Sequence, residues 1–201
     1  FSLGQNTKID SLKNALKTAK EDTNKVNALN MLGWEYKYSN PDTSFILLSQ
    51  ALALAKKIKW EKGKANSHSN LGVYYWFKAD YSKALENHFA ALKIDEALNN
   101  KKGIATRLGN IGLVYWNQAD YPKALEYYFR ALKIDEHLGN KNGVARHLGN
   151  IGIIYKEQVD YPKALNYYLK ALKIAEELGD KYLIAIHLSN IGIVYNELSD
   201  Y

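Results

Sequence analysis

The chain has 201 residues, of which 47% are hydrophobic and none is cysteine, so it can bury a sizeable core but can form neither a disulfide nor a thiolate metal site. Basic residues exceed acidic ones by six charges, yet only three are arginines and the lysines alternate with acids, which favours a solvated face over a nucleic-acid surface. No apolar run approaches the 18 or so residues that a membrane span requires.

The first 22 residues fit a helix of their own, because Ile9, Leu12, Leu16 and Ala19 recur at spacings of three and four. We expect this segment, residues 1–22, to cap the array that follows. The opening residues, Phe1 to Gln5, are interpreted as the remnant of a secretory signal's apolar segment. The compartment is therefore left open between cytoplasmic and exported or periplasmic.

A 40-residue repeat occupies the rest of the chain, residues 23–201. Asn-Leu/Ile-Gly stands at 70–72, 110–112, 150–152 and 190–192, and a tyrosine follows each glycine by three residues. A fixed period of this length is typical of solenoids, in which each unit buries its apolar face against its neighbours. We expect repeats at about 24–63, 64–103, 104–143 and 144–183, with a truncated fifth at 184–201.

Each repeat is predicted to be a hairpin of two antiparallel helices. In the third repeat, Leu108, Ile111 and Tyr115 share one side of the first helix. Asp120 supplies an acceptor side chain at the start of the second helix, and Gly139 suits the left-handed residue that ends it. The chain ends at Asp200-Tyr201, the pair that begins a second helix elsewhere, so we expect the natural protein to continue.

This pattern resembles the tetratricopeptide repeat family, in a long variant of 40 residues where 34 is usual. The residues that carry the resemblance are Leu108, Ile111, Gly112, Tyr115, Ala124, Tyr128 and Ala131. The resemblance implies an all-α fold, a right-handed superhelix (α-solenoid) of antiparallel helix pairs. It also implies a protein-binding or peptide-binding scaffold, similar to the N-terminal sensor arrays of bacterial signalling proteins, with an output domain elsewhere in a larger protein.

The side of each first helix opposite the core is the predicted binding surface. Packed helices lie roughly 8–10 Å apart and an extended peptide advances about 3.3 Å per residue, so one asparagine per repeat can meet every third peptide residue. An amide can pair with a backbone C=O and N–H together, and the resemblance implies this role for the asparagines. The predicted peptide-binding groove comprises Asn70, Asn110, Asn150, Asn190, Trp76, Thr106, Leu113, Trp116, Asn117, Arg146, Ile153, Lys156 and Glu157.

Other interpretations remain open for these residues. The asparagines can equally bond a neighbouring helix and have been copied with the repeat, and Trp76 and Trp116 can pack between repeats. For the whole chain, the alternatives are a structural spacer or self-association module, pairing through its terminal repeats, and a less favoured RNA-binding helical repeat.

Catalytic motifs are absent from the sequence: there is no phosphate-binding loop, metalloprotease motif or nucleophile elbow. We therefore expect no enzymatic activity and no cofactor in these residues. His147 and His187 are expected to be partly exposed and, one repeat apart, too distant to share a metal ion. The expected partner is a protein or peptide, with no nucleic acid and no direct membrane contact.

Overall fold

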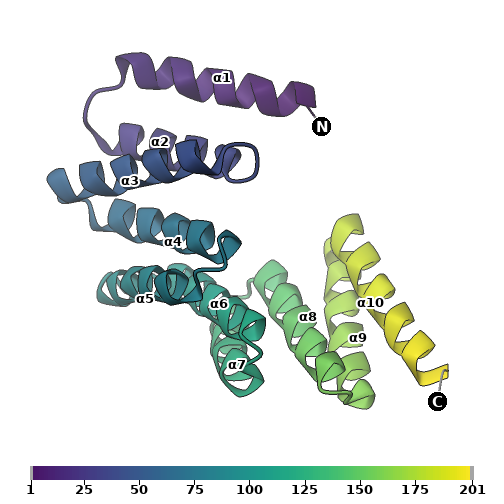
Figure 1. Ribbon diagram of the computed structural model, residues 1–201. Helices are drawn as coiled ribbons and strands as arrows, with labels where there is room; N and C mark the ends of the chain where they lie inside the picture. Colours follow the sequence, from purple (N-terminus) through teal and green to yellow (C-terminus); the bar gives the residue numbers. More distant parts are fainter. Residues whose placement is uncertain (1, 200–201) are drawn as a thin grey trace. The chain divides into compact units, whose positions relative to one another are not determined.

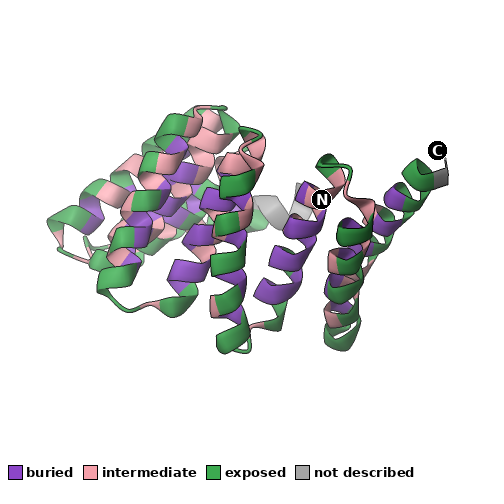
Figure 2. Cartoon of the chain, turned by 90° about the horizontal axis from the view of Figure 1, so that it is seen from below, coloured by how far each residue is buried: buried purple, intermediate pink, exposed green. Residues whose placement is uncertain are grey.

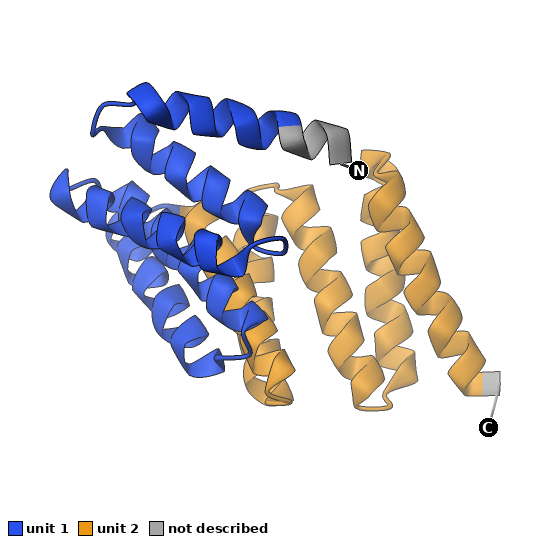
Figure 3. Ribbon diagram, turned by 45° about the horizontal axis from the view of Figure 1, so that its top comes forward, with its two compact units in different colours: residues 1–100 blue, residues 101–201 orange. Residues whose placement is uncertain are grey.

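The computed structural model describes residues 2–199, with side chains described for residues 7–198. These residues form ten α-helices and no strand (Figure 1), which confirms the predicted all-α fold. The expectations for Phe1 to Gln5 and for Asp200-Tyr201 rest on residues or side chains outside this description. The chain divides into two compact units, residues 1–100 and residues 101–201 (Figure 3), which we call unit 1 and unit 2.

Unit 1 consists of a leading helix followed by two helical hairpins. The leading helix α1 packs against α2, where Ile9 is buried and Lys8 bonds Glu35 at 2.6 Å. The hairpins are α2/α3 and α4/α5, and their first helices α2 and α4 are in contact. The bounds are α1 Ser2–Thr18, α2 Thr23–Tyr36, α3 Pro41–Lys57, α4 Glu61–Phe77 and α5 Tyr81–Ala97.

Unit 2 repeats the same construction with two hairpins and one further helix. The hairpins are α6/α7 and α8/α9, and α10 packs against α9 and also contacts α8. The bounds are α6 Lys101–Asn117, α7 Tyr121–His137, α8 Lys141–Glu157, α9 Tyr161–Leu178 and α10 Lys181–Ser199.

The second helices α5, α7 and α9 begin in the way the sequence predicts. Asp80, Asp120 and Asp160 each accept a hydrogen bond from the backbone N–H three residues on. The residue at that position is a lysine, which also pairs with the aspartate at 2.6–2.8 Å. The residue before each aspartate has a positive φ of 55–60° although it carries a Cβ atom. Such a conformation costs about 1–2 kcal/mol, so hairpin packing must hold these turns in place.

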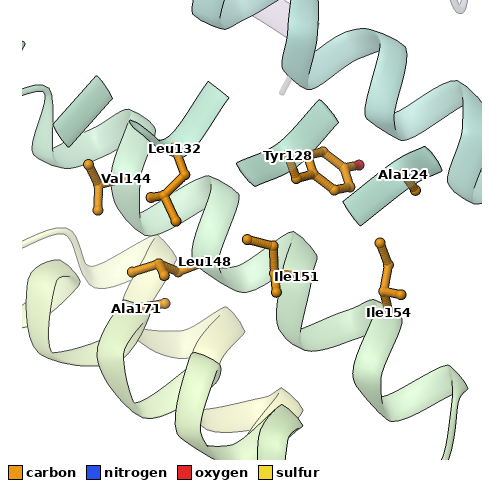
Figure 4. Close-up of a cluster of buried hydrophobic side chains, with 8 residues drawn as sticks. All are labelled: Ala124, Tyr128, Leu132, Val144, Leu148, Ile151, Ile154 and Ala171. Atoms are coloured by element: carbon orange, nitrogen blue, oxygen red, sulfur yellow. The ribbon is translucent and has the colours of Figure 1, made fainter. Parts of the chain in front are cut away.

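Buried residues lie along one side of the helices that form the hairpins (Figure 2). A hydrophobic cluster in unit 2 joins α7 to α8 and α9 of the next hairpin (Figure 4), and Tyr128, Ile151 and Ile154 are among its members. Aliphatic and aromatic side chains at spacings of three and four supply these buried positions, as the sequence predicts.

A glycine in each first helix lies directly beneath a large side chain of the second helix. A Cβ atom on Gly152 would lie 2.6 Å from Cε1 of Tyr168, and one on Gly112 would lie 3.0 Å from Cδ1 of Tyr128. Both tyrosine rings are buried. Glycine is therefore needed at these positions for close helix approach, despite a helix-propensity cost of about 1 kcal/mol.

We expect Gly152→Ala to lower the free energy of unfolding by about 1–2 kcal/mol, because the enclosed Tyr168 ring cannot move away from the new methyl group. Gly192 holds the equivalent position in α10, where an added Cβ would meet nothing within 4 Å. Gly192→Ala is thus a matched control that should raise stability slightly through helix propensity. Urea unfolding of both variants measures the difference, and equal destabilisation by the two would refute the packing role.

Candidate functional site

Three asparagines of unit 2 occupy equivalent positions on successive first helices. Asn110 lies on α6, Asn150 on α8 and Asn190 on α10, and each is half-buried. The next residue in every case is a buried isoleucine of the core, so the amide lies at the edge of the core face. Among the side chains that the structure describes, residues 7–198, none forms a hydrogen bond with these three amides. We call them the asparagine row.

Aliphatic side chains accompany the asparagine row three residues further along each helix. Leu113 on α6 and Ile153 on α8 are half-buried, and Ile193 on α10 is exposed. Residues three apart on a helix are neighbours on its surface. Each first helix of unit 2 therefore offers one amide beside one aliphatic side chain.

The equivalent amide in unit 1 is already used within the protein. Asn70 donates a hydrogen bond of 3.1 Å to Oδ1 of Asn30, and Asn30 donates one of 2.9 Å to Oγ of Ser67. Asn30 is buried and lies 40 residues before Asn70, so it is the first member of the series. Asn30 does not stand out in the sequence because the first repeat departs from the common motif, although its 40-residue spacing from Asn70 is a usable signal. In unit 1, these asparagines bond a neighbouring helix.

The predicted polar residues around the row have varied surroundings. Thr106 and Asn117 donate hydrogen bonds to carbonyl groups of their own helix, at 2.9 and 2.8 Å. Arg146 is exposed, and Lys156 pairs with its neighbour Glu157 at 3.0 Å. These residues supply charges of both signs and no single-sign surface.

The two predicted tryptophans are both half-buried. In unit 1, Trp76 packs edge-on against Phe77 with ring centroids 4.7 Å apart, and its indole Nε1 is buried with no hydrogen-bond partner. In unit 2, Trp116 packs against the hydrophobic cluster around α7 and α8. The contact of Trp116 with this cluster is consistent with packing between helices.

The expectation that His147 and His187 are partly exposed is wrong: both are buried. A Cβ atom on Gly109 would lie 2.6 Å from Cε1 of His147, and one on Gly149 would lie 2.7 Å from Cε1 of His187. Each imidazole thus occupies the space left by a glycine on the preceding first helix. Their burial depends on contacts with other helices, which the pattern within one repeat does not reveal.

His147 has one acidic neighbour, Asp135 of α7, whose Oδ2 lies 3.2 Å from Nε2 outside hydrogen-bond geometry. Asp135 is also buried and accepts a hydrogen bond of 2.8 Å from Asn140. Burial, and then the charge of Arg146, lowers the pKa of His147 from 6.5 to about 4, against the opposing effect of Asp135. In the part of the chain that the structure describes, no three His, Asp or Glu side chains gather as metal ligands.

We expect the stability of the protein to depend on His147 below neutral pH. Its pKa is lower in the folded state, so between pH 6.5 and about 4 the unfolded state binds more protons. The stability that the neutral His147 provides is therefore fully present above pH 6.5 and is lost as the pH falls towards 4. Urea unfolding at pH 7.5 and 5.0 should show the loss, and His147→Gln should reduce the difference between the two pH values. Part should remain, because burial also lowers the pKa of His187. An undiminished difference in the variant would contradict this assignment.

No helix among the described residues is both long and apolar enough to cross a membrane. The hairpins, the packing glycines and the stacked first helices define an all-α protein of the helical-repeat (α-solenoid) class. The family model of the tetratricopeptide repeat matches residues 63–137, 103–177 and 143–201, which together exceed half of the chain. The chain therefore belongs to the tetratricopeptide repeat family. No curated protein matches the sequence.

Solved structures of similar fold come from several contexts. BtubC from P. vanneervenii is 20% identical with a TM-score of 0.79, covering 98% of this chain and 82% of that one. A signal transduction ATPase (STAND) with a tetratricopeptide repeat sensor, from Pyrococcus horikoshii, is 20% identical with a TM-score of 0.80, covering 93% of this chain and 29% of that one. A Rap protein complexed with Competence and Sporulation Factor is 20% identical with a TM-score of 0.83, covering 98% of this chain and 60% of that one. At this identity, the similarity establishes the fold.

Proposed function

We propose that unit 2 binds an extended peptide or protein segment along the asparagine row. The repeats of this family support a role for the chain as an interaction scaffold. One observation carries the proposal: Asn110, Asn150 and Asn190 each present an amide that forms no hydrogen bond within the described chain. An amide has two donors and an accepting oxygen, so each can pair with a peptide C=O and N–H from the same side chain.

The spacing of the row suits an extended chain. Successive first helices of unit 2 are in contact, with His147 of α8 against Gly109 of α6 and His187 of α10 against Gly149 of α8. Helices in contact lie roughly 8–10 Å apart, the length of about three residues of extended peptide. Between amide contacts, the peptide side chains would meet the aliphatic side chains of Leu113, Ile153 and Ile193.

The proposed binding mode reads the peptide backbone more than its side chains. The nearby charges of Arg146, Lys156 and Glu157 are mixed, and Lys156 and Glu157 already pair with each other. This mixture of charges gives no reason to expect capture of a terminal carboxylate. The ligand is therefore expected to be an internal extended segment with apolar residues at intervals.

The wider role we propose is that of a sensory or interaction domain in a larger signalling protein. Two of the structurally similar proteins support it: one is a signal transduction ATPase with a repeat sensor, and the other is a Rap protein complexed with Competence and Sporulation Factor. The chain spans 29% and 60% of these proteins, so the activities of the whole proteins are not carried over.

The first test removes two amides of the row. Peptides are selected from a random display library on the wild-type chain, and their affinities are then measured by fluorescence anisotropy. Asn110→Ala with Asn150→Ala should weaken binding by about tenfold or more, since each lost hydrogen bond contributes roughly 0.5–1.5 kcal/mol. Gln118→Ala with Asn166→Ala removes two exposed amides elsewhere in unit 2 and should leave binding unchanged.

The second arm of this test examines the peptide. N-methylation of alternate peptide bonds should abolish the binding, whereas alanine substitution of single side chains should reduce it only modestly. If the double asparagine variant folds normally and binds every selected peptide as well as the wild type does, the proposal fails. Loss of binding to both asparagine and control variants would equally contradict a role for the row.

Self-association is a second candidate, favoured by the surface of α10. Leu188, Tyr195 and Leu198 are exposed there, whereas Leu148, equivalent to Leu188, is buried. Exposed apolar rows of this kind mark helix–helix interfaces.

If α10 mediates association, light scattering should show a mass that rises with protein concentration, because two apolar faces can bury each other. Leu188→Glu should then keep the protein monomeric, since it places a charge in that interface. Leu169→Glu is the control, because it changes an exposed leucine of α9. If the measured mass of the wild type stays equal to that of a single chain over a hundredfold concentration range, self-association is excluded.

A further inference from the structure

Unit 1 exposes aromatic side chains where its two first helices end. Trp34 in the last turn of α2, Tyr38 just after it and Phe77 at the end of α4 are 40%, 69% and 39% exposed. The rings of Tyr38 and Phe77 meet edge to face, with centroids 4.9 Å apart. The three rings therefore belong to one surface that joins the first and second repeats.

Contacts within unit 1 fix the position of these rings. Trp76 packs edge-on against Phe77 at 4.7 Å, and Trp76 itself is half-buried. The helices α2 and α4 that carry the rings contact each other directly. Aromatic side chains fixed in this way offer a large contact area at little entropic cost on binding, which is typical of interface anchors.

A lysine lies among the rings without a carboxylate partner. Nζ of Lys37 is 4.0 Å from the ring centroid of Trp34 and 4.6 Å from that of Tyr38, and it donates to the Trp34 carbonyl at 3.3 Å. Burial lowers the pKa of Lys37, although the charge of Glu35 acts in the opposite direction. The Glu35 carboxylate is bonded to Lys8 at 2.6 Å, so it does not neutralise Lys37.

We propose that Trp34, Lys37, Tyr38 and Phe77 form a second binding surface, the aromatic–lysine patch, for a peptide segment in which a large apolar side chain neighbours a carboxylate. The apolar side chain packs on the exposed rings. The carboxylate pairs with Lys37, whose partial desolvation strengthens such a pair. The patch lies in unit 1 and involves none of the amides of the asparagine row, so it is independent of the function proposed above.

The charge around the rings favours a peptide over single-stranded nucleic acid and over a membrane surface, which also bind to aromatic and cationic side chains. Single-stranded nucleic acid needs a positively charged groove that follows the phosphates, and a membrane surface needs several basic residues around the aromatic ones. Among the described residues, Lys37 is the cation that lies over these rings, Lys8 nearby is paired with Glu35, and all three arginines belong to unit 2. One cation in contact with the rings, Lys37, matches one carboxylate beside one apolar group.

The experiment uses synthetic seven-residue peptides on the full chain. The probe peptides are a labelled Gly-Asp-Phe-Glu-Leu-Asp-Gly, its lysine counterpart with each acid replaced, and its serine counterpart with both apolar residues replaced. A random seven-residue display library, counter-selected on the patch variants, covers the sequence contexts that the fixed peptides omit. A dT20 oligonucleotide and vesicles of anionic phospholipid serve as the competing ligands.

Lys37→Glu, and separately Tyr38→Ser with Phe77→Ser, should each weaken the acidic peptides by roughly tenfold, as expected for anchor residues. Tyr182→Ser, at a tyrosine of α10 that is 75% exposed, is the matched control and should change nothing. Asn110→Ala with Asn150→Ala should also leave this binding intact. That result separates the patch from the asparagine row, whichever of the two proposals fails.

Three results would overturn the inference. The first is a library that yields no peptide dependent on the patch, or only basic ones. The second is acidic-peptide binding that both patch variants retain. The third is tighter, patch-dependent binding of the oligonucleotide or the vesicles.

Discussion

The contact between a first-helix glycine and a second-helix side chain is the constraint on which every hairpin depends. At Gly112 and Gly152 the overlying group is a tyrosine ring, which fills the space of a missing Cβ and brings the two backbones close. Earlier in the chain the same space is filled by different chemistry. Leu48 lies over Gly33 and His88 lies over Gly72, with distances of 2.8 and 2.6 Å to the added Cβ position. The repeat therefore conserves a shape, and the residue that fills it varies.

A second glycine contact does the same work between repeats. Gly109 and Gly149 receive the rings of His147 and His187 from the next first helix. In the second repeat, Ser67 holds the position equivalent to His147, 80 residues before it. Ser67 has no ring and instead accepts a hydrogen bond from Asn30. Burying an imidazole with few hydrogen bonds is costly, which is why this contact brings a pH dependence that the tyrosine contacts do not. Stacking of the first helices in unit 2 thus depends on protonation, whereas hairpin closure by the tyrosines over Gly112 and Gly152 does not.

The fold followed from the sequence because its signals are local and repeated. The 40-residue period is visible by comparing the repeats. Each repeat also contains its own helix start, such as Asp120 or Asp160, and its own packing glycine. The site followed less well, because each missed feature depends on a neighbouring element. The histidines are covered by another helix. Asn30 lies in the repeat that departs most from the motif. The aromatic–lysine patch brings together Tyr38 of an irregular turn and the end of α4, a pairing without a sequence motif.

The asparagines show how one repeated residue can divide between stability and recognition. A buried amide must find its hydrogen bonds within the protein, and Asn30 does so through Ser67 and Asn70. A half-buried amide can instead be satisfied by water, and a ligand that replaces the water loses little. Asn110, Asn150 and Asn190 are in this second situation. Gene duplication alone would copy the residue but not its surroundings. The neighbouring residues decide whether each copy bonds its own chain or remains open to another, so the binding proposal rests on unit 2.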